Sequence, residues 1–143
     1  DMGEPRGDLL IKSSKLKGIT IDKNTIPKII DEIPILSLAA CFANSETIIK
    51  DAEELRIKES DRIKATVDGL YKLGANINET NDGMIIKPSS RLTGNKVESY
   101  GDHRIAMMLG IAGLLSEGTT VIEGAEHASV SYPNFWDEID KNN

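Results

Sequence analysis

Apolar residues recur every three to four positions between residues 60 and 74, and this spacing predicts an amphipathic helix. We expect the helix to begin with Ser60 as its N-cap, to carry Asp61 in its first turn and to end at Gly74. Its buried face is expected to consist of Ile63, Val67, Leu70 and Leu73.

Two longer segments, residues 33–43 and 105–115, carry almost no charge and predict buried helices. The first is expected to begin near Asp31, because Pro34 suits a first helical turn, and the second near Arg104. At 11 residues each, the two apolar segments are too short to span a bilayer.

Short runs rich in β-branched residues predict strands. Asn81-Asp82-Gly83 is a strong turn signal, so the runs on either side of it are expected to pair as a hairpin. The expected strands are residues 9–12, 46–50, 76–79, 84–86, the region of Val97 and 119–123, and a last helix is expected over residues 133–139.

These elements repeat with a period of about 75 residues. Residues 13–18 reappear as residues 89–94, and residues 47–53 reappear as residues 120–126. The repetition predicts an α/β (α+β) fold of β-α-β-α-β-β units, with about one and a half to two units present and a boundary near residues 88–94.

Composition narrows the class of protein. The chain has 143 residues, of which 39% are hydrophobic and 28% charged, and this balance excludes wholesale disorder. The net charge of −6 argues against general binding to nucleic acid or to anionic membranes. Cys41 is the only cysteine and is expected in the core, and no metal site is expected with just two histidines beside it.

The start of the chain and its cysteine content bear on origin and location. The polar, glycine-rich start lacks an initiator Met, so we expect a piece of a longer polypeptide. No secretory signal pattern is present, and a single cysteine is typical of a reducing compartment, so a cytoplasmic location is expected.

Positive charge stands near two expected helix starts, where the helix dipole disfavours it. Lys58 and Arg62 flank the first start, and Arg104 follows Asp102 at the second. Cations placed beside helix N–H groups can bind a phosphate or a carboxylate. The alternative is that these charges are merely solvated and that Asp102 is only an N-cap. The spacing of the residues alone does not favour either interpretation. Neither arginine is expected to be part of the core.

The two charged motifs resemble those of the 5-enolpyruvylshikimate-3-phosphate synthase family. They are residues 55–63 (Leu-Arg-Ile-Lys-Glu-Ser-Asp-Arg-Ile) and 101–107 (Gly-Asp-His-Arg-Ile-Ala-Met), with Ile26-Pro27 and Asp31 upstream. The resemblance covers essentially the whole chain and matches the last third of the family's enzyme. It implies two domains of β-α-β-α-β-β units with the active site between them.

The resemblance implies a transferase of the shikimate pathway of aromatic amino-acid biosynthesis. Such an enzyme moves the enolpyruvyl group of phosphoenolpyruvate to the 5-hydroxyl of shikimate 3-phosphate and releases phosphate, and no cofactor is implied. The N-terminal part of the enzyme would supply the other side of the cleft, so this chain alone is expected to be inactive.

Roles for individual residues follow from the same resemblance. Asp31 matches a carboxylate that holds and deprotonates the 5-hydroxyl of shikimate 3-phosphate, and Glu59 matches the acid/base carboxylate near the methylene carbon of phosphoenolpyruvate. Lys58 matches a basic residue at shikimate 3-phosphate, whereas Arg62 and Arg104 match arginines that clamp the phosphoenolpyruvate anion.

Three further positions need comment. His103 matches a cleft histidine of less certain role. Glu54 stands where many family members have Asn, and Val130 where many have Lys, so two substrate contacts are expected to be altered.

Two alternatives stay open. The sister transferase that acts on UDP-N-acetylglucosamine shares the repeat architecture, although the two charged motifs are not its pattern. A non-catalytic domain of the same fold could instead bind anions without turning over a substrate.

Overall fold

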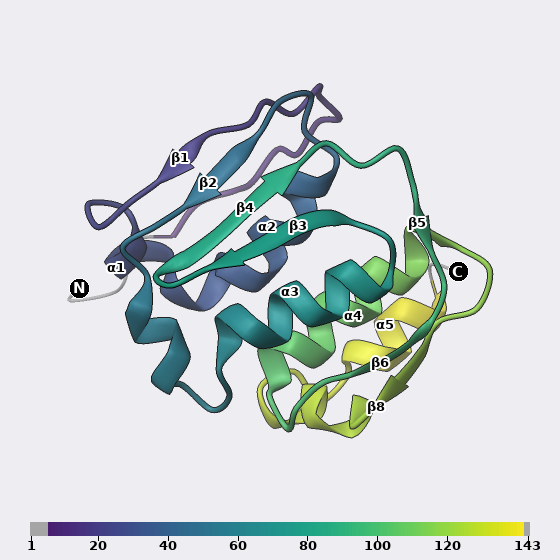
Figure 1. Ribbon diagram of the computed structural model, residues 1–143. Helices are drawn as coiled ribbons and strands as arrows, with labels where there is room; N and C mark the ends of the chain where they lie inside the picture. The colour runs from purple at the N-terminus through teal and green to yellow at the C-terminus, as the bar shows by residue number, and fades with distance from the viewer. Residues whose placement is uncertain (1–5, 142–143) are drawn as a thin grey trace.

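The computed structural model describes residues 6–141, and its largest unit is a four-stranded sheet that carries helices on one face (Figure 1). The strands are β1 (Thr20–Ile21), β2 (Thr47–Ile49), β3 (Asn76–Thr80) and β4 (Gly83–Lys87), in the order β1-β2-β4-β3. β1 runs parallel to β2, and the other neighbours are antiparallel. In this register Ile77 on β3 lies opposite Ile86 on β4, so both side chains reach the same buried face.

The helices form the layer beneath this sheet (Figure 1). They are α1 (Ile26–Ile29), α2 (Ile33–Cys41), α3 (Arg62–Lys72) and α4 (His103–Leu114), with 3-10 turns η1 (Ile30–Glu32) and η2 (Glu53–Ile57). α2 contacts β4, α3 contacts β3, and α4 packs against both helices. Gly69 permits a close crossing, because a Cβ there would lie 2.8 Å from Leu109 Cδ2 on α4. α3 and α4 thus pack directly against each other.

The C-terminal part covers the other side of α4. β5 (Leu92–Thr93) pairs with β7 (Ser116–Glu117), β6 (Lys96–Glu98) pairs with β8 (Val121–Glu123), and η3 (Ala125–Val130) leads to α5 (Phe135–Lys141). α4 contacts β8, η3 and α5, so it is enclosed between the first helix layer and this part. The main core extends from the sheet to Leu92 and Val97, and a second, smaller cluster of Ala106, Ala128 and Phe135 joins α4 to η3 and α5.

Most of the predicted elements are confirmed. The helices near Asp31, Ser60, Arg104 and residues 133–139, the 76–86 hairpin and the strands at 46–50, 97 and 119–123 all form, with bounds shifted by up to about two residues. Cys41 is buried as expected, and burial raises the pKa of its thiol to about 11. The division into repeated units near residues 88–94 stays a prediction.

Two predictions about local structure are wrong. Residues 9–12 form no strand; Leu9, Leu10 and Ile11 are exposed, since no strand among residues 6–141 pairs with them. The N-cap of α3 is Asp61 rather than Ser60: the Asp61 carboxylate accepts from the Lys64 amide at 3.0 Å, while Ser60 uses its hydroxyl elsewhere. The short strands β1, β5 and β7 were not predicted, because two residues give too little pattern.

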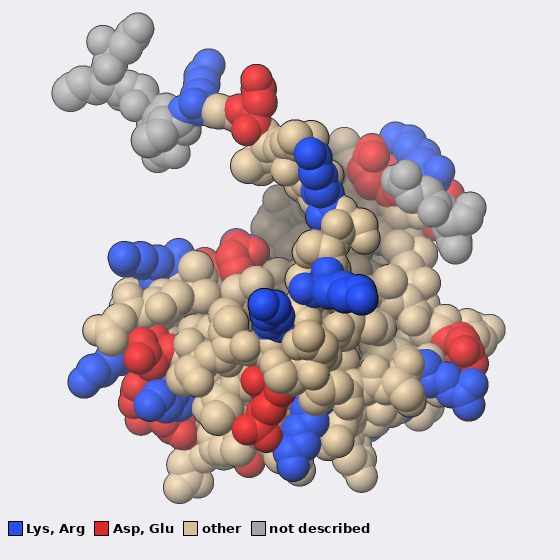
Figure 2. Space-filling view, turned by 90° about the horizontal axis from the view of Figure 1, so that it is seen from above, with Lys and Arg blue, Asp and Glu red and all other residues tan. Residues whose placement is uncertain are grey.

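The surface of the described residues is mixed in charge. In Figure 2 basic and acidic side chains are interspersed on the face seen from above, so positive charge is not gathered into one patch there. No helix within residues 6–141 is long and apolar enough to cross a membrane.

Candidate active site

Three segments that are far apart in the sequence meet around one arginine. Asp31 comes from η1. Glu59 lies just before α3, Arg62 is the first residue of α3, and Asp102 precedes α4. Arg62 contacts all three carboxylates. Hydrogen bonds from Ser60 and Arg62 to Asp102 join the two charged motifs directly.

The Arg62 guanidinium lies at the centre of this cluster and is 1% exposed. Its Nε donates to Asp102 Oδ2 at 2.8 Å, its Nη1 donates to Asp31 Oδ1 at 2.9 Å, and its Nη2 donates to Glu59 Oε2 at 2.5 Å. The expectation that Arg62 is not part of the core is therefore wrong. A buried guanidinium needs several acceptors, and the surrounding carboxylates provide them.

Asp102 is the second buried member of the cluster and links the two helix starts. It accepts from Ser60 Oγ at 3.0 Å and, as the N-cap of α4, from the Arg104 amide at 2.8 Å. Burial alone raises the pKa of this carboxyl, but the hydrogen bonds and the charge of Arg62 outweigh that effect and lower it below its usual value. Asp102 thus remains an anion and holds Arg62 in place.

Asp102 and Ser60 are functional candidates that sequence reasoning missed. A helix N-cap and a polar residue before a helix are common, so neither residue carried a distinctive signal. The signal that could have pointed to Asp102 is its place inside the second charged motif, two residues before Arg104.

Arg104 occupies a more open position on the first turn of α4. Its side chain is 28% exposed; Nη1 pairs with Glu32 Oε1 at 2.8 Å and Nη2 lies 3.8 Å from Asp31 Oδ2. Its Nε is buried and has no hydrogen-bond partner among the described residues. Arg104 therefore retains a donor that an anionic ligand could use.

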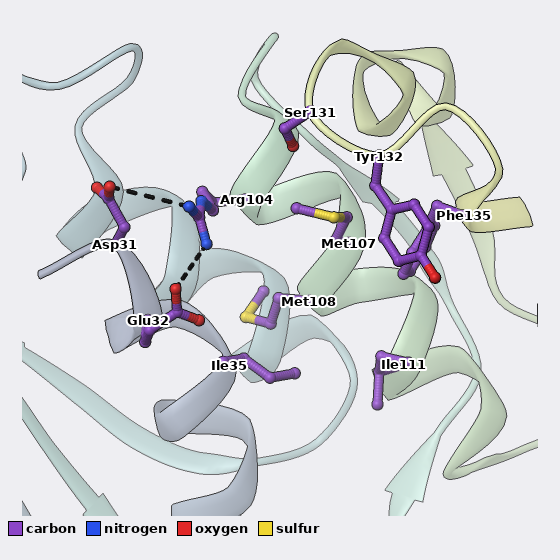
Figure 3. A pocket seen from close by; sticks show the side chains of 10 residues that line it. All are labelled: Asp31, Glu32, Ile35, Arg104, Met107, Met108, Ile111, Ser131, Tyr132 and Phe135. Atoms are coloured by element: carbon purple, nitrogen blue, oxygen red, sulfur yellow. Dashed lines mark hydrogen bonds and ion pairs between the residues drawn. The ribbon is translucent and has the colours of Figure 1, made fainter. Parts of the chain in front are cut away.

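Arg104 lies at the polar end of a pocket of about 360 Å³ (Figure 3). Asp31 and Glu32 line the same end, whereas the remainder is mostly apolar. Those other lining residues are Ile35, Met107, Met108, Ile111, Ser131, Tyr132 and Phe135. The pocket thus combines a cation and two carboxylates with an apolar wall formed by α2, α4 and the segment before α5.

The other expected site residues lie at the edges of this cluster. Lys58 pairs with Glu54 at 3.2 Å, so the acidic residue that replaces the expected Asn contacts the expected substrate-binding lysine. His103 is the first residue of α4 and is half-buried, and Val130 is exposed at the end of η3.

The arrangement is suited to proton transfer beside a bound anion. The side chains of Asp31 and Glu59 are 51% and 49% exposed, and both are oriented by Arg62. Carboxylates held in this way can exchange protons with a ligand in the adjoining space. Within the described range no cluster of His, Cys, Asp and Glu is arranged to hold a metal ion.

Comparison with known proteins identifies the family of this chain. The family model for EPSP synthase (3-phosphoshikimate 1-carboxyvinyltransferase) matches residues 3–139. The chain belongs to the EPSP synthase family. The expected fold class and resemblance are thereby confirmed.

Individual relatives within the EPSP synthase family are close. A 3-phosphoshikimate 1-carboxyvinyltransferase of Bacillus cereus (strain B4264) is 56% identical over 138 residues, which cover 96% of this chain and 32% of that protein. A relative of the same name from Roseiflexus sp. (strain RS-1) is 53% identical over 93% of this chain and 31% of its own length. The chain thus spans about a third of these relatives.

A solved structure shares the fold. EPSP synthase from Acinetobacter baumannii superposes with a TM-score of 0.83 at 39% identity, covering 89% of this chain and 30% of that one.

Proposed function

We propose that the enzyme containing this segment transfers the enolpyruvyl group of phosphoenolpyruvate to the 5-hydroxyl of shikimate 3-phosphate and releases phosphate. The observation that carries the proposal is the placement of Asp31 and Glu59, from separate segments, on the same buried arginine. Two carboxylates in fixed positions suit a reaction that moves one proton to carbon and another from oxygen.

The proposed chemistry is an addition followed by an elimination. Glu59 as an acid protonates the methylene carbon of phosphoenolpyruvate, while Asp31 accepts the proton of the 5-hydroxyl, whose oxygen bonds to the neighbouring carbon. Glu59, now a carboxylate, then takes a proton back from the new methyl group, the double bond re-forms and the carbon–oxygen bond to phosphate breaks. Phosphate and the enolpyruvyl ether are the two products.

Anion binding would fall mainly to Arg104. Arg104 lines the pocket and its Nε has no partner among the described residues, whereas the donors of Arg62 are already engaged with carboxylates. Arg62 would join the phosphoenolpyruvate site once an anion competes with Asp31 or Glu59 for its Nη groups. Lys58 would assist at shikimate 3-phosphate, and His103 is retained as a further candidate in the cleft.

The other side of the cleft would come from the remaining two thirds of the enzyme, so the 143-residue chain alone is expected to release no phosphate. We also propose a cytoplasmic location, which the single buried thiol of Cys41 supports.

The first prediction tests the acid/base role in the full-length enzyme. Replacing Glu59→Gln removes the proton donor but keeps the side-chain size, so kcat should fall by about 10²–10⁴ with a modest change in KM. The measurement is steady-state phosphate release, with Glu98→Gln, an exposed acid on β6, as the matched control. Near-normal kcat in Glu59→Gln would remove Glu59 from the mechanism.

Calorimetry separates the proposal from its alternatives. Full-length protein should bind shikimate 3-phosphate and not UDP-N-acetylglucosamine. Binding of the latter would point to the sister transferase, whereas binding of anions without any phosphate release would point to a non-catalytic domain.

A further inference from the structure

The segment that carries Lys58 and Glu59 is anchored in the core by Ala52 and Leu55, but residues 57–60, which follow them, are exposed or half-buried. Between β2 and α3 the chain contains just the short η2 turn and a series of bends. Glu59 is exposed apart from its contact with Arg62, and Ile57 is exposed as well. Residues 57–60 therefore need further support from outside the segment.

The support comes from the tip of the β3–β4 hairpin, through Arg56. Arg56 Nε donates to the carbonyl of Asn81 at 3.0 Å, and Nη2 donates to the carbonyl of Thr80 at 2.7 Å. Its Nη1 contacts Glu79 Oε1 on β3 and Asp61 Oδ2, each at 2.8 Å. Since Asp61 is the N-cap of α3, Arg56 joins the hairpin to the helix start.

The same hairpin tip holds the beginning of the segment. Asp82 accepts from the Asp51 amide through Oδ2 and from the Ala52 amide through its carbonyl, each at 2.8 Å. The approach is close, because a Cβ on Gly83 would lie 2.0 Å from the carbonyl oxygen of Ile49. Both ends of the segment are thus tied to one rigid turn.

These contacts leave no nitrogen of the Arg56 guanidinium available to bind a substrate. Its nitrogens are all engaged with protein acceptors, unlike the Nε of Arg104, and its side chain is 26% exposed. Arg56 precedes Lys58 by two residues and Glu59 by three, so a displacement of Arg56 would be passed directly to both. A shift of about 1 Å in a reacting group can cost a hundredfold in rate.

We propose that Arg56 is a positioning residue, which uses the tip of the β3–β4 hairpin to fix the segment that carries Lys58 and Glu59. This inference rests on the proposed function for its effect on turnover, but the tether itself is a property of the fold.

The activity test uses Arg56→Gln and Arg56→Lys in the full-length enzyme. Arg56→Gln should lower kcat about ten- to a hundredfold with a smaller change in KM for either substrate, because the acid/base geometry is disturbed more than the anion site. Arg56→Lys keeps the charge but cannot reach all the acceptors, so it should recover part of the loss. The control is Arg91→Gln, which removes an arginine from an exposed pair with Glu117 and should leave kcat unchanged.

Amide hydrogen exchange provides a second measurement that needs no activity. In Arg56→Gln, exchange across residues 53–61 should rise about tenfold or more, while amides of α4 and β8 stay at wild-type rates. If wild-type enzyme shows no turnover, the proposed function fails, and the exchange result still decides whether the tether exists.

Three outcomes would overturn the inference. They are unchanged exchange in residues 53–61, an equal rise in exchange throughout the protein, and a local rise with wild-type kcat in both Arg56 variants. The last of these would make Arg56 purely structural.

Discussion

The starts of α3 and α4 each place an arginine where the helix dipole disfavours a cation, yet the two arginines are held in opposite ways. Arg62 is 1% exposed and contacts three carboxylates, of which Asp102 is itself fully buried. Arg104 is 28% exposed, pairs with Glu32 and Asp31 at the surface, and keeps a donor without a partner among the described residues. The same sequence signature thus produces one arginine buried among carboxylates and one that is partly exposed at the edge of a pocket.

The energetic consequence follows from burial. A buried ion pair contributes little net stability compared with a well-packed apolar pair, but removing one partner leaves a charge in a medium that solvates it poorly. An exposed pair exchanges its partner for water at small cost. Removal of the two arginines should therefore have very different effects on folding.

The largest expected effect is on stability. Replacing Arg62→Met leaves the Asp102 carboxylate buried without a cation and should reduce the free energy of unfolding by about 3–5 kcal/mol. Arg104→Met, the matched variant, should cost about 1 kcal/mol or less. Urea unfolding of both variants is the measurement, and equal losses would mean that burial does not distinguish the two helix starts.

This contrast marks the limit of what the sequence could predict. Apolar periodicity predicted α3, the nearly uncharged segment 105–115 predicted α4, and the Asn81-Asp82-Gly83 turn predicted the hairpin. The resemblance of the motifs to a known family also predicted that Asp31, Glu59, Arg62 and Arg104 belong to one site. Which arginine is buried could not be predicted, because it depends on the close crossing at Gly69 and on the position of Asp102, both set by tertiary packing.

The absent strand at residues 9–12 has a similar cause. An apolar run favours a strand, but a strand forms only beside a partner, and no strand within residues 6–141 pairs with it. Local pattern therefore predicts a tendency, whereas pairing decides the outcome.

A second, smaller effect is expected on substrate use, where replacing the two arginines should change KM for the two substrates differently. In the full-length enzyme, Arg104→Lys keeps the charge but loses the planar fork, so KM for phosphoenolpyruvate should rise roughly ten- to a hundredfold, as expected for loss of about 1.5–3 kcal/mol. KM for shikimate 3-phosphate and the thermal melt should change little. Arg62→Lys should instead weaken the use of both substrates and lower the melting temperature, because it releases Asp31 and Glu59.

One kinetic result would contradict the predicted difference between Arg62→Lys and Arg104→Lys. If Arg62→Lys raises KM for phosphoenolpyruvate alone and leaves the melt unchanged, Arg62 is a substrate clamp of the same kind as Arg104. The difference between the helix starts would then be confined to exposure.

The smallest expected effect concerns the pH dependence of the buried pair. Arg62 holds the pKa of Asp102 below its usual range despite the opposing effect of burial, whereas the unfolded carboxyl titrates near about 3.9. Below about pH 4 the unfolded chain therefore binds a proton that the folded protein does not, so the contribution of Asp102 to stability is complete above that pH and declines as the pH falls.

Asp102→Asn does not titrate, and its stability should decline less steeply, by at most about 1.4 kcal/mol per pH unit. Urea midpoints between pH 3 and about pH 6 measure the two slopes; Asp68 and Asp82, whose pKa values are also lowered, are present in both proteins and cancel in the difference. Parallel curves for wild type and Asp102→Asn would show that Asp102 is not stabilised as an anion, and the start of α3 would then lose the feature that distinguishes it from the start of α4.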